Sequence, residues 1–148
     1  MSVRPSHVIV LYRPSAEASA ALTAASALAR DAGARLTVLT VALVESVDRP
    51  CCDIRSSYWN QVVQERAADE LRTAADVLGR EPGVEFAVVR GSSIPDVLTR
   101  EAAERGGDLI VVPRGSFPRF QLRTRRLRRK VQRLGSCRVL ELPAARAA

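Results

Sequence analysis

The chain has 148 residues, 47% of them hydrophobic, and a formal net charge of +7. This length supports one hydrophobic core but not two independent ones, so we expect a single domain over residues 1–148. Three cysteines without regular spacing and one histidine favour neither a disulfide framework nor a metal site, and they predict a protein of the reducing cytoplasm.

The charge is distributed unevenly along the chain. Residues 1–112 contain 12 arginines and 15 acidic residues, which gives a net charge of −3. Residues 113–148 contain ten arginines, one lysine and one acidic residue, which gives +10. This asymmetry predicts a field that attracts phosphates, nucleic acid or an acidic partner. The alternative is a solvated helix face in an arginine-rich protein, since Lys130 is the only lysine.

The first predicted element is a strand over residues 7–12, HVIVLY, whose continuous apolar run is typical of a strand buried on both faces. The run is too short for a signal peptide or a membrane span. Ser15 is the predicted N-cap of an alanine-rich helix that continues to Ala32, and Gly33 ends it. A second buried strand over 36–43 follows, so the two strands should form a parallel pair with a right-handed crossover.

The middle of the chain begins with a predicted loop over 44–57, which contains a proline and adjacent cysteines at 51–52. A second helix is predicted over 58–79. Its aromatic residues Tyr58 and Trp59 offer a pair for ligand stacking, but we favour the interpretation that Trp59 covers the edge of the core. The apolar residues at helical spacing are Val63, Ala67, Leu71, Ala74 and Leu78.

The next segment alternates again between strand and helix. Residues 84–90 predict a third strand, and 94–105 predict a helix with Ser93 as N-cap and Pro95 in its first turn. Two glycines end that helix. A fourth strand is predicted over 109–112.

The basic end of the chain contains a helix predicted over 122–134, followed by Gly135 as its C′ residue and a fifth strand over 137–142. Five strands interleaved with four helices indicate a doubly wound α/β domain, whose ligands bind beyond the carboxyl ends of the strands. Residues 143–148 are expected to be disordered. The apolar stripe of the basic helix consists of Leu127, Val131 and Leu134.

Four stretches of this chain resemble the universal stress protein family. They are VIVLYRPS, LTVLTV, CRVLEL and, most specifically, VEFAVVRGSSIPDVLTREAAERGGDLIVV. The resemblance covers essentially the whole chain. It implies a Rossmann-like doubly wound five-stranded parallel sheet of order 3-2-1-4-5 with four helices, a stress-response or regulatory role, and commonly a homodimer.

Nucleotide-binding members of that family carry G-x2-G-x9-G-[S/T] after the fourth strand. The glycines let backbone N–H groups approach phosphates, and the last pair opens a helix whose N-terminus favours anions. In this chain Pro113 occupies the first glycine position, and Arg125 and Arg126 occupy the last pair. Gly115 is the one glycine that is kept, so the resemblance implies a degenerate ATP-binding motif.

The end of the first strand also lacks residues of the family's nucleotide-binding motif. Arg13 and Pro14 stand where ATP-binding members have Asp and Gly, and only Ser15 of that motif is kept. Replacing the aspartate with arginine reverses the charge at the adenosine end. We expect Arg13, Arg114, Arg125 and Arg126 either to converge on a polyanion or to extend into solvent. The full candidate pocket is Arg13, Ser15, Thr40, Val41, Arg114, Gly115, Ser116, Arg125 and Arg126.

Three functions are compatible with these features. The first is a universal stress protein-like binding module that is not a standard ATP binder and requires no cofactor. The second is binding of ATP, AMP or another anion at the arginine-rebuilt pocket. The third is contact of the basic helix with nucleic acid or an acidic protein, through Arg123, Arg126, Arg129, Lys130 and Arg133.

An enzyme is the least supported class. The sequence offers no Ser/His/Asp or Cys/His pair at a credible site. Slow ATP hydrolysis, which the resemblance also allows, would need the degenerate loop.

Overall fold

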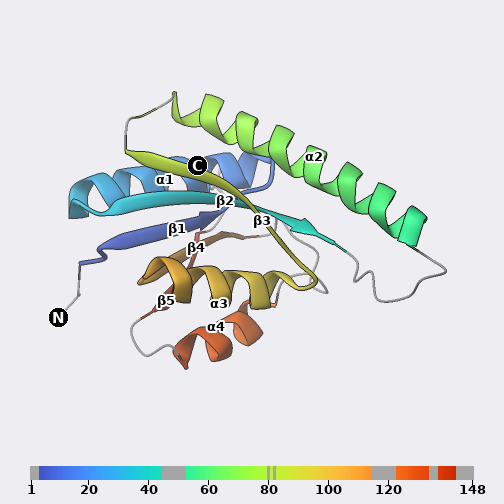
Figure 1. Cartoon of the computed structure of the whole chain (residues 1–148). Helices are drawn as coiled ribbons and strands as arrows, with labels where there is room; N and C mark the ends of the chain where they lie inside the picture. The colour runs from blue at the N-terminus through green and yellow to red at the C-terminus, as the bar shows by residue number, and fades with distance from the viewer. Residues whose placement is uncertain are drawn as a thin grey trace.

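A computed structural model of the chain describes residues 4–44, 53–79, 81, 83–114, 123–133 and 137–142 (Figure 1). Strands and helices alternate throughout, as the sequence predicts. In chain order they are β1 (His7–Leu11), α1 (Ala16–Ala32), β2 (Arg35–Leu43), α2 (Asp53–Leu78), β3 (Val84–Gly91), α3 (Ile94–Arg105), β4 (Leu109–Pro113), α4 (Thr124–Gln132) and β5 (Arg138–Leu142).

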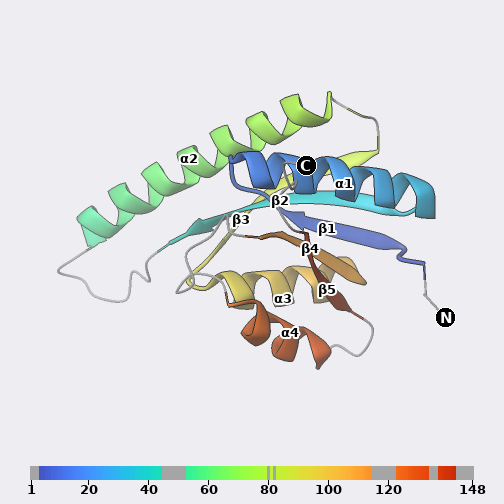
Figure 2. The same ribbon diagram turned by 180° about the vertical axis from the view of Figure 1, so that it is seen from behind.

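The five strands form one parallel sheet in the order β3-β2-β1-β4-β5, which confirms the predicted doubly wound α/β architecture. Helices α1 and α2 cover one face of the sheet, and α3 and α4 cover the other (Figures 1 and 2). Side chains of the central strand alternate between the two layers: Val8 and Val10 belong to the core beneath α1 and α2, whereas Ile9 and Leu11 belong to the core beneath α3 and α4.

The first helix begins and ends where its capping residues predict. The Ser15 hydroxyl oxygen accepts a hydrogen bond from the Ala18 N–H at 3.0 Å, which satisfies one of the free donors of the first turn. At the other end Gly33 has φ of 66°, a left-handed conformation that glycine adopts without steric cost. The cap therefore fixes where the chain leaves α1 for β2.

Helix α2 starts at Asp53, earlier than predicted, so the predicted loop over 44–57 is wrong for its last five residues. No proline or glycine lies between Asp53 and Tyr58, and therefore nothing in the sequence stops the helix from extending toward its N-terminus. The cysteines at 51–52 lie outside the described residues. Figure 1 shows the first half of α2 projecting past the sheet.

The aromatic residues of α2 contradict the interpretation that Trp59 covers the core edge. Neither residue is at the start of the helix, and the exposed fractions are 53% for Trp59 and 72% for Tyr58. The cause is the projection of α2, since this part of the helix extends past the sheet that would bury them. The later positions of the predicted stripe behave as expected, because Ala67, Ala74 and Leu78 are buried.

Helix α4 is shorter than the predicted 122–134. Arg123 stands at its N-cap without a side-chain hydrogen bond, and Arg133 is its C-cap residue. A weak N-cap and the repulsion among consecutive arginines both disfavour longer propagation. Residues 122, 134 and the predicted C′ residue Gly135 lie outside the described part of the chain. The helix is nevertheless anchored as predicted, since Leu127 and Val131 are buried.

Candidate functional site

A pocket of about 610 Å³ lies at the carboxyl end of the sheet, between the starts of α3 and α4. We call it the α3–α4 pocket. Its lining residues are Leu43 at the end of β2, residues 92–95 at the start of α3, and Arg123 and Arg126 of α4. The volume is within the range of small-molecule sites. Doubly wound folds place ligands at this end of the sheet.

Electrostatics favour an anion in the α3–α4 pocket. The first turn of α3 has free backbone N–H groups there, because the Ser93 side chain makes no capping hydrogen bond. Asp96, in the same turn, forms an ion pair with Lys130 of α4. Among the described residues, Arg123 and Arg126 have no acidic partner. Two guanidinium groups are thus available beside a helix N-terminus.

Several of the residues predicted to form the pocket make contacts within the fold. Ser15 caps α1. The Thr40 hydroxyl donates to the Ala67 carbonyl of α2 at 3.0 Å, so it anchors that helix against β2. Val41 packs against the core beneath α3 and α4. These residues therefore serve the scaffold on which the carboxyl end of the sheet is built.

The predicted arginines point to different elements. Burial raises the pKa of the Glu70 carboxyl on α2, and the nearby charge of Arg13 opposes that rise, so Arg13 faces α2. The Arg114 Nε lies 4.0 Å from the Glu141 Oε1 of β5. Arg126 lines the α3–α4 pocket and Arg125 does not. The structure thus does not gather these arginines around one anion, and Gly115 and Ser116 lie outside the described residues.

Sequence reasoning missed two parts of this pocket. The sequence pattern assigns Arg123 only to the basic helix surface, and it predicts only a helix cap at the start of α3. A signal was nevertheless present, because Ser93 and Pro95 mark a helix N-terminus that directly follows a strand. In a parallel sheet, that position always lies at the end where ligands bind.

The single histidine of the sequence lies at the opposite end of the sheet from this pocket, and both of its ring nitrogens have hydrogen-bond partners. His7 is at the amino end of β1, where its Nδ1 donates to the Arg105 carbonyl at 3.0 Å. Its Nε2 lies 2.6 Å from the Thr37 hydroxyl. It therefore supplies no general base to the carboxyl end of the sheet. In the described part of the chain, no group of three or more His, Cys, Asp or Glu residues is arranged to hold a metal ion.

No helix in the described ranges is both long enough and apolar enough to span a membrane.

Comparison with known proteins gives one consistent result. The model of the universal stress protein family matches residues 5–136. No curated protein sequence matches the chain. A universal stress protein family member from Burkholderia pseudomallei is 27% identical with a TM-score of 0.66, and the match covers 94% of this chain and 96% of that one.

Two further solved structures share the fold at lower identity. The universal stress protein UspA from Lactobacillus plantarum is 22% identical with a TM-score of 0.72, covering 95% of this chain and 99% of that one. A family protein from Arabidopsis thaliana with AMP bound is 18% identical with a TM-score of 0.59, covering 96% and 94% of the two chains.

Proposed function

Because the chain belongs to the universal stress protein family, we propose that it is a stress-response or regulatory binding module that holds a small anion in the α3–α4 pocket. The observation that supports this is the pair Arg123 and Arg126, which have no acidic partner in the described residues and stand beside the N-terminus of α3. Relatives from Arabidopsis thaliana and Archaeoglobus fulgidus were crystallised with AMP and dAMP. A nucleoside monophosphate is therefore one candidate ligand.

We propose that the protein is not a standard ATP binder. Pro113 ends β4 at the position where nucleotide-binding relatives have their first loop glycine, and proline has no N–H to donate to a phosphate. Arg13 faces α2 from the position where those relatives have an aspartate. The groups that would bind the triphosphate and the adenosine are thus both replaced. The arginines of α4 suit a smaller anion.

Isothermal titration calorimetry with AMP, ATP and inorganic phosphate tests the proposal. We expect AMP or phosphate to bind the wild-type protein, and the Arg123→Gln/Arg126→Gln variant to lose that binding, because the charge-assisted contacts are gone. A variant with Arg66→Gln and Arg72→Gln removes the same charge from exposed positions on α2 and should bind normally. Stoichiometric ATP in the purified protein would contradict the proposed absence of standard ATP binding.

We further propose that the protein is a cytoplasmic homodimer without an enzymatic role. Dimers are common in the family. The sheet has an outer strand, β5, whose second edge is unpaired among the described residues, and such an edge is a template for pairing with another copy. Among the described residues that line the α3–α4 pocket none is a positioned base, which favours binding over hydrolysis.

The outer face of α4 supports a second candidate function, contact with nucleic acid or an acidic protein. Leu127 and Val131 fix the orientation of the helix against the core, and the remaining surface is basic. Six positions of that surface are exposed arginines, and the segment carries no acidic residue. We call them the arginine face: Arg123, Arg125, Arg126, Arg128, Arg129 and Arg133.

The salt dependence of binding to a random-sequence DNA duplex tests this candidate. Each phosphate contact contributes a slope of about −0.9 in log K against log salt concentration. We expect Arg125→Gln/Arg129→Gln/Arg133→Gln to reduce the slope by up to about 2.7 if all three residues contact phosphates. Unchanged binding to DNA, with binding to polyglutamate lost in the same variant, would assign the face to an acidic protein instead.

A further inference from the structure

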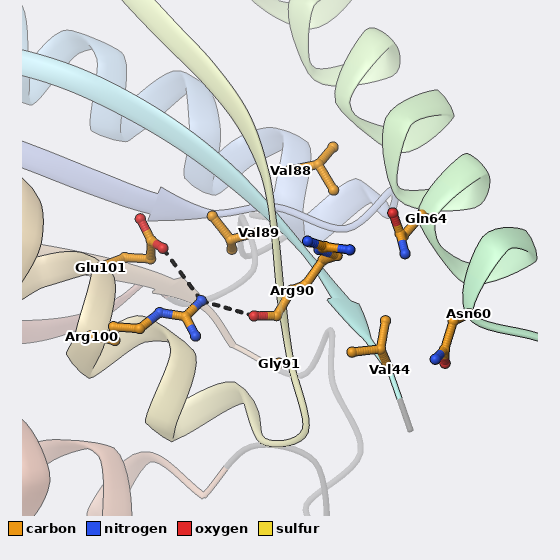
Figure 3. A pocket seen from close by; sticks show the side chains of 9 residues that line it. All are labelled: Val44, Asn60, Gln64, Val88, Val89, Arg90, Gly91, Arg100 and Glu101. Atoms are coloured by element: carbon orange, nitrogen blue, oxygen red, sulfur yellow. Dashed lines mark hydrogen bonds and ion pairs between the residues drawn. The ribbon is translucent and has the colours of Figure 1, made fainter. Parts of the chain in front are cut away.

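A second pocket, of about 520 Å³, lies at the β3 edge of the sheet, between α2, the end of β3 and α3 (Figure 3). We call it the edge pocket. It shares no lining residue with the α3–α4 pocket. Its polar side chains come from three elements: Asn60 and Gln64 from α2, Arg90 from β3, and Arg100 and Glu101 from α3.

The two amides occupy positions on α2 where apolar residues would be expected. The core-facing line of the helix runs through Leu78, Ala74, Leu71 and Ala67 toward its N-terminus, and the same helical spacing continues to Gln64 and Asn60. Both amides are half-buried and line the edge pocket.

Three large apolar residues of the same helical turns, Tyr58, Trp59 and Val62, are exposed, whereas Val63 is half-buried. This stretch of α2 projects past the sheet, so its inward-facing line meets the edge pocket and not the core. The two amides on that line therefore offer hydrogen-bonding groups to an occupant of the pocket.

The charges around the pocket leave a positive excess. Glu101 is the acidic residue of the lining, but it is buried and already paired: one carboxylate oxygen accepts from Arg105 Nε at 2.8 Å, and the other lies 3.5 Å from Arg100 Nη2. Arg90 has no acidic partner among the described residues. Figure 3 shows Arg90 and Gln64 extending toward each other from β3 and α2.

A backbone contact holds Arg100 at the end of β3. Arg100 Nη2 donates to the Arg90 carbonyl at 2.8 Å, and this bond fixes the α3 side chain at the end of β3. The next residue is Gly91, where a Cβ atom would lie 2.2 Å from Cγ2 of Val97. Glycine therefore allows β3 to end directly against α3.

We propose that the edge pocket binds a small organic anion. Its carboxylate or phosphate group pairs with Arg90, which presents the planar donor geometry that such groups accept. Its polar body forms hydrogen bonds with Asn60 and Gln64, whose amides offer both donors and acceptors. The pocket volume is sufficient for a ligand of that size. This site is independent of the α3–α4 pocket.

NMR titration of the 15N-labelled protein tests the proposal, with citrate as the carboxylate probe and ribose 5-phosphate as the phosphate probe. We expect at least one of them to shift the side-chain amide signals of Asn60 and Gln64 together with the backbone amides of residues 88–91. The probe that shifts them identifies the anionic group. Absence of these shifts with both probes at millimolar concentration would overturn the proposal.

Variants separate a ligand site from a bulk effect of charge. Arg90→Gln should weaken the binding of the active probe by about tenfold or more, because a charge-assisted contact is lost. Arg35→Gln removes an exposed arginine from the opposite end of the sheet and should leave binding unchanged. If both variants weakened probe binding equally, the loss of net charge alone would explain the effect, and the site would be refuted. Arg123→Gln/Arg126→Gln should leave the shifts intact, whatever becomes of the α3–α4 pocket.

Gln64→Leu distinguishes a ligand contact from a structural role. If the amide serves a ligand, leucine restores the apolar line of α2, so the melting temperature of the ligand-free protein should rise while binding is lost. A lower melting temperature with binding retained would assign Gln64 to the fold and contradict the proposal.

Discussion

A single carboxylate, Asp108, joins the amino ends of β1 and β4. Its Oδ2 accepts from the Ser6 N–H at 2.7 Å and from the Ser6 hydroxyl at 3.0 Å. Its Oδ1 accepts from the His7 N–H at 3.1 Å. Burial acts to raise the pKa of Asp108, but these hydrogen bonds outweigh it, and the pKa is lowered. The ionised carboxylate is therefore the form that holds the two strands in register.

Asp108→Asn should lower the free energy of unfolding at pH 7 by about 1.5 kcal/mol, the lower end for hydrogen bonds to a charged group, because Ser6 is exposed. A lowered folded-state pKa gives stability that is complete above the ordinary value of 3.8 and is lost as the pH falls through the folded-state value. Urea denaturation should thus show the difference between wild type and variant shrinking below about pH 4. Asp31→Asn, at an exposed position, is the control. A difference that stays constant with pH would contradict a role for the charge.

Cys137 is expected to be an unreactive thiol. Burial, followed by the negative charge of Asp108, raises its pKa to about 11, and the thiolate is the reactive form. In a Cys51→Ser/Cys52→Ser background, a thiol reagent at pH 8 should modify the native protein far more slowly than the unfolded chain. The neutral thiol stabilises the fold below the ordinary pKa of 9.0, and this contribution is lost as the pH rises through about 11. Rapid stoichiometric modification of the native protein would contradict the raised pKa.

At the scale of elements, local signals predicted some boundaries and not others. Helices α1 and α3 match their predicted ranges because Ser15, Pro95 and two glycine stops act on the backbone directly. The sequence does not predict the start of α2, because only a helix-breaking proline or glycine would mark it. Neither residue occurs between Asp53 and Tyr58.

The candidate site was less predictable than the fold. The position of a ligand pocket at the carboxyl end of the sheet follows from topology. Which arginines reach it depends on the acids that compete for them. Glu70 lies near Arg13 and Glu141 lies near Arg114, and both acids are far from those arginines in sequence. Residue spacing in the sequence does not predict such pairs, because they form only when the chain folds.

Helix α4 is held to the core by few buried side chains, so the substitution of one of them should destabilise the protein. Leu127 is fully buried in the core beneath α3 and α4, and Leu127→Ala should lower the free energy of unfolding by about 2–5 kcal/mol. The volume-conserving Leu127→Met should cost less than about 1.5 kcal/mol. Urea denaturation measures both, and hydrogen exchange shows whether α4 opens alone. A loss below about 1 kcal/mol for the alanine variant would contradict the anchoring role.

Across the whole molecule, the two pockets lie on either side of the carboxyl end of β2. Val44, the residue after that strand, lines the edge pocket, and Leu43, its last residue, lines the α3–α4 pocket. Both pockets contain two arginines. Four arginines that line pockets thus lie at the carboxyl end of the sheet, whereas the amino end carries the hydrogen bonds of Asp108 and His7.

The proposed homodimer depends on β5, the outer strand of the sheet. Beside it, a largely apolar hollow of about 780 Å³ is lined by residues that include Leu28, Leu109 and Leu140, a surface that a second copy can bury. Glu141 is half-buried on the same strand, and Arg114 at 4.0 Å offsets part of its charge. Two such carboxylates brought together across a dimer axis would repel each other and lose water.

Glu141→Leu should therefore strengthen self-association by about tenfold in the dimer dissociation constant. Sedimentation velocity over a concentration series measures this, with Glu104→Leu, an exposed acid on α3, as the matched control. If only the loss of net negative charge mattered, the two variants would associate equally. If β5 is the interface, the gain is specific to Glu141→Leu, and high salt should strengthen the wild-type dimer by screening the repulsion. A dissociation constant unchanged by Glu141→Leu would place the dimer contact on another surface of the molecule.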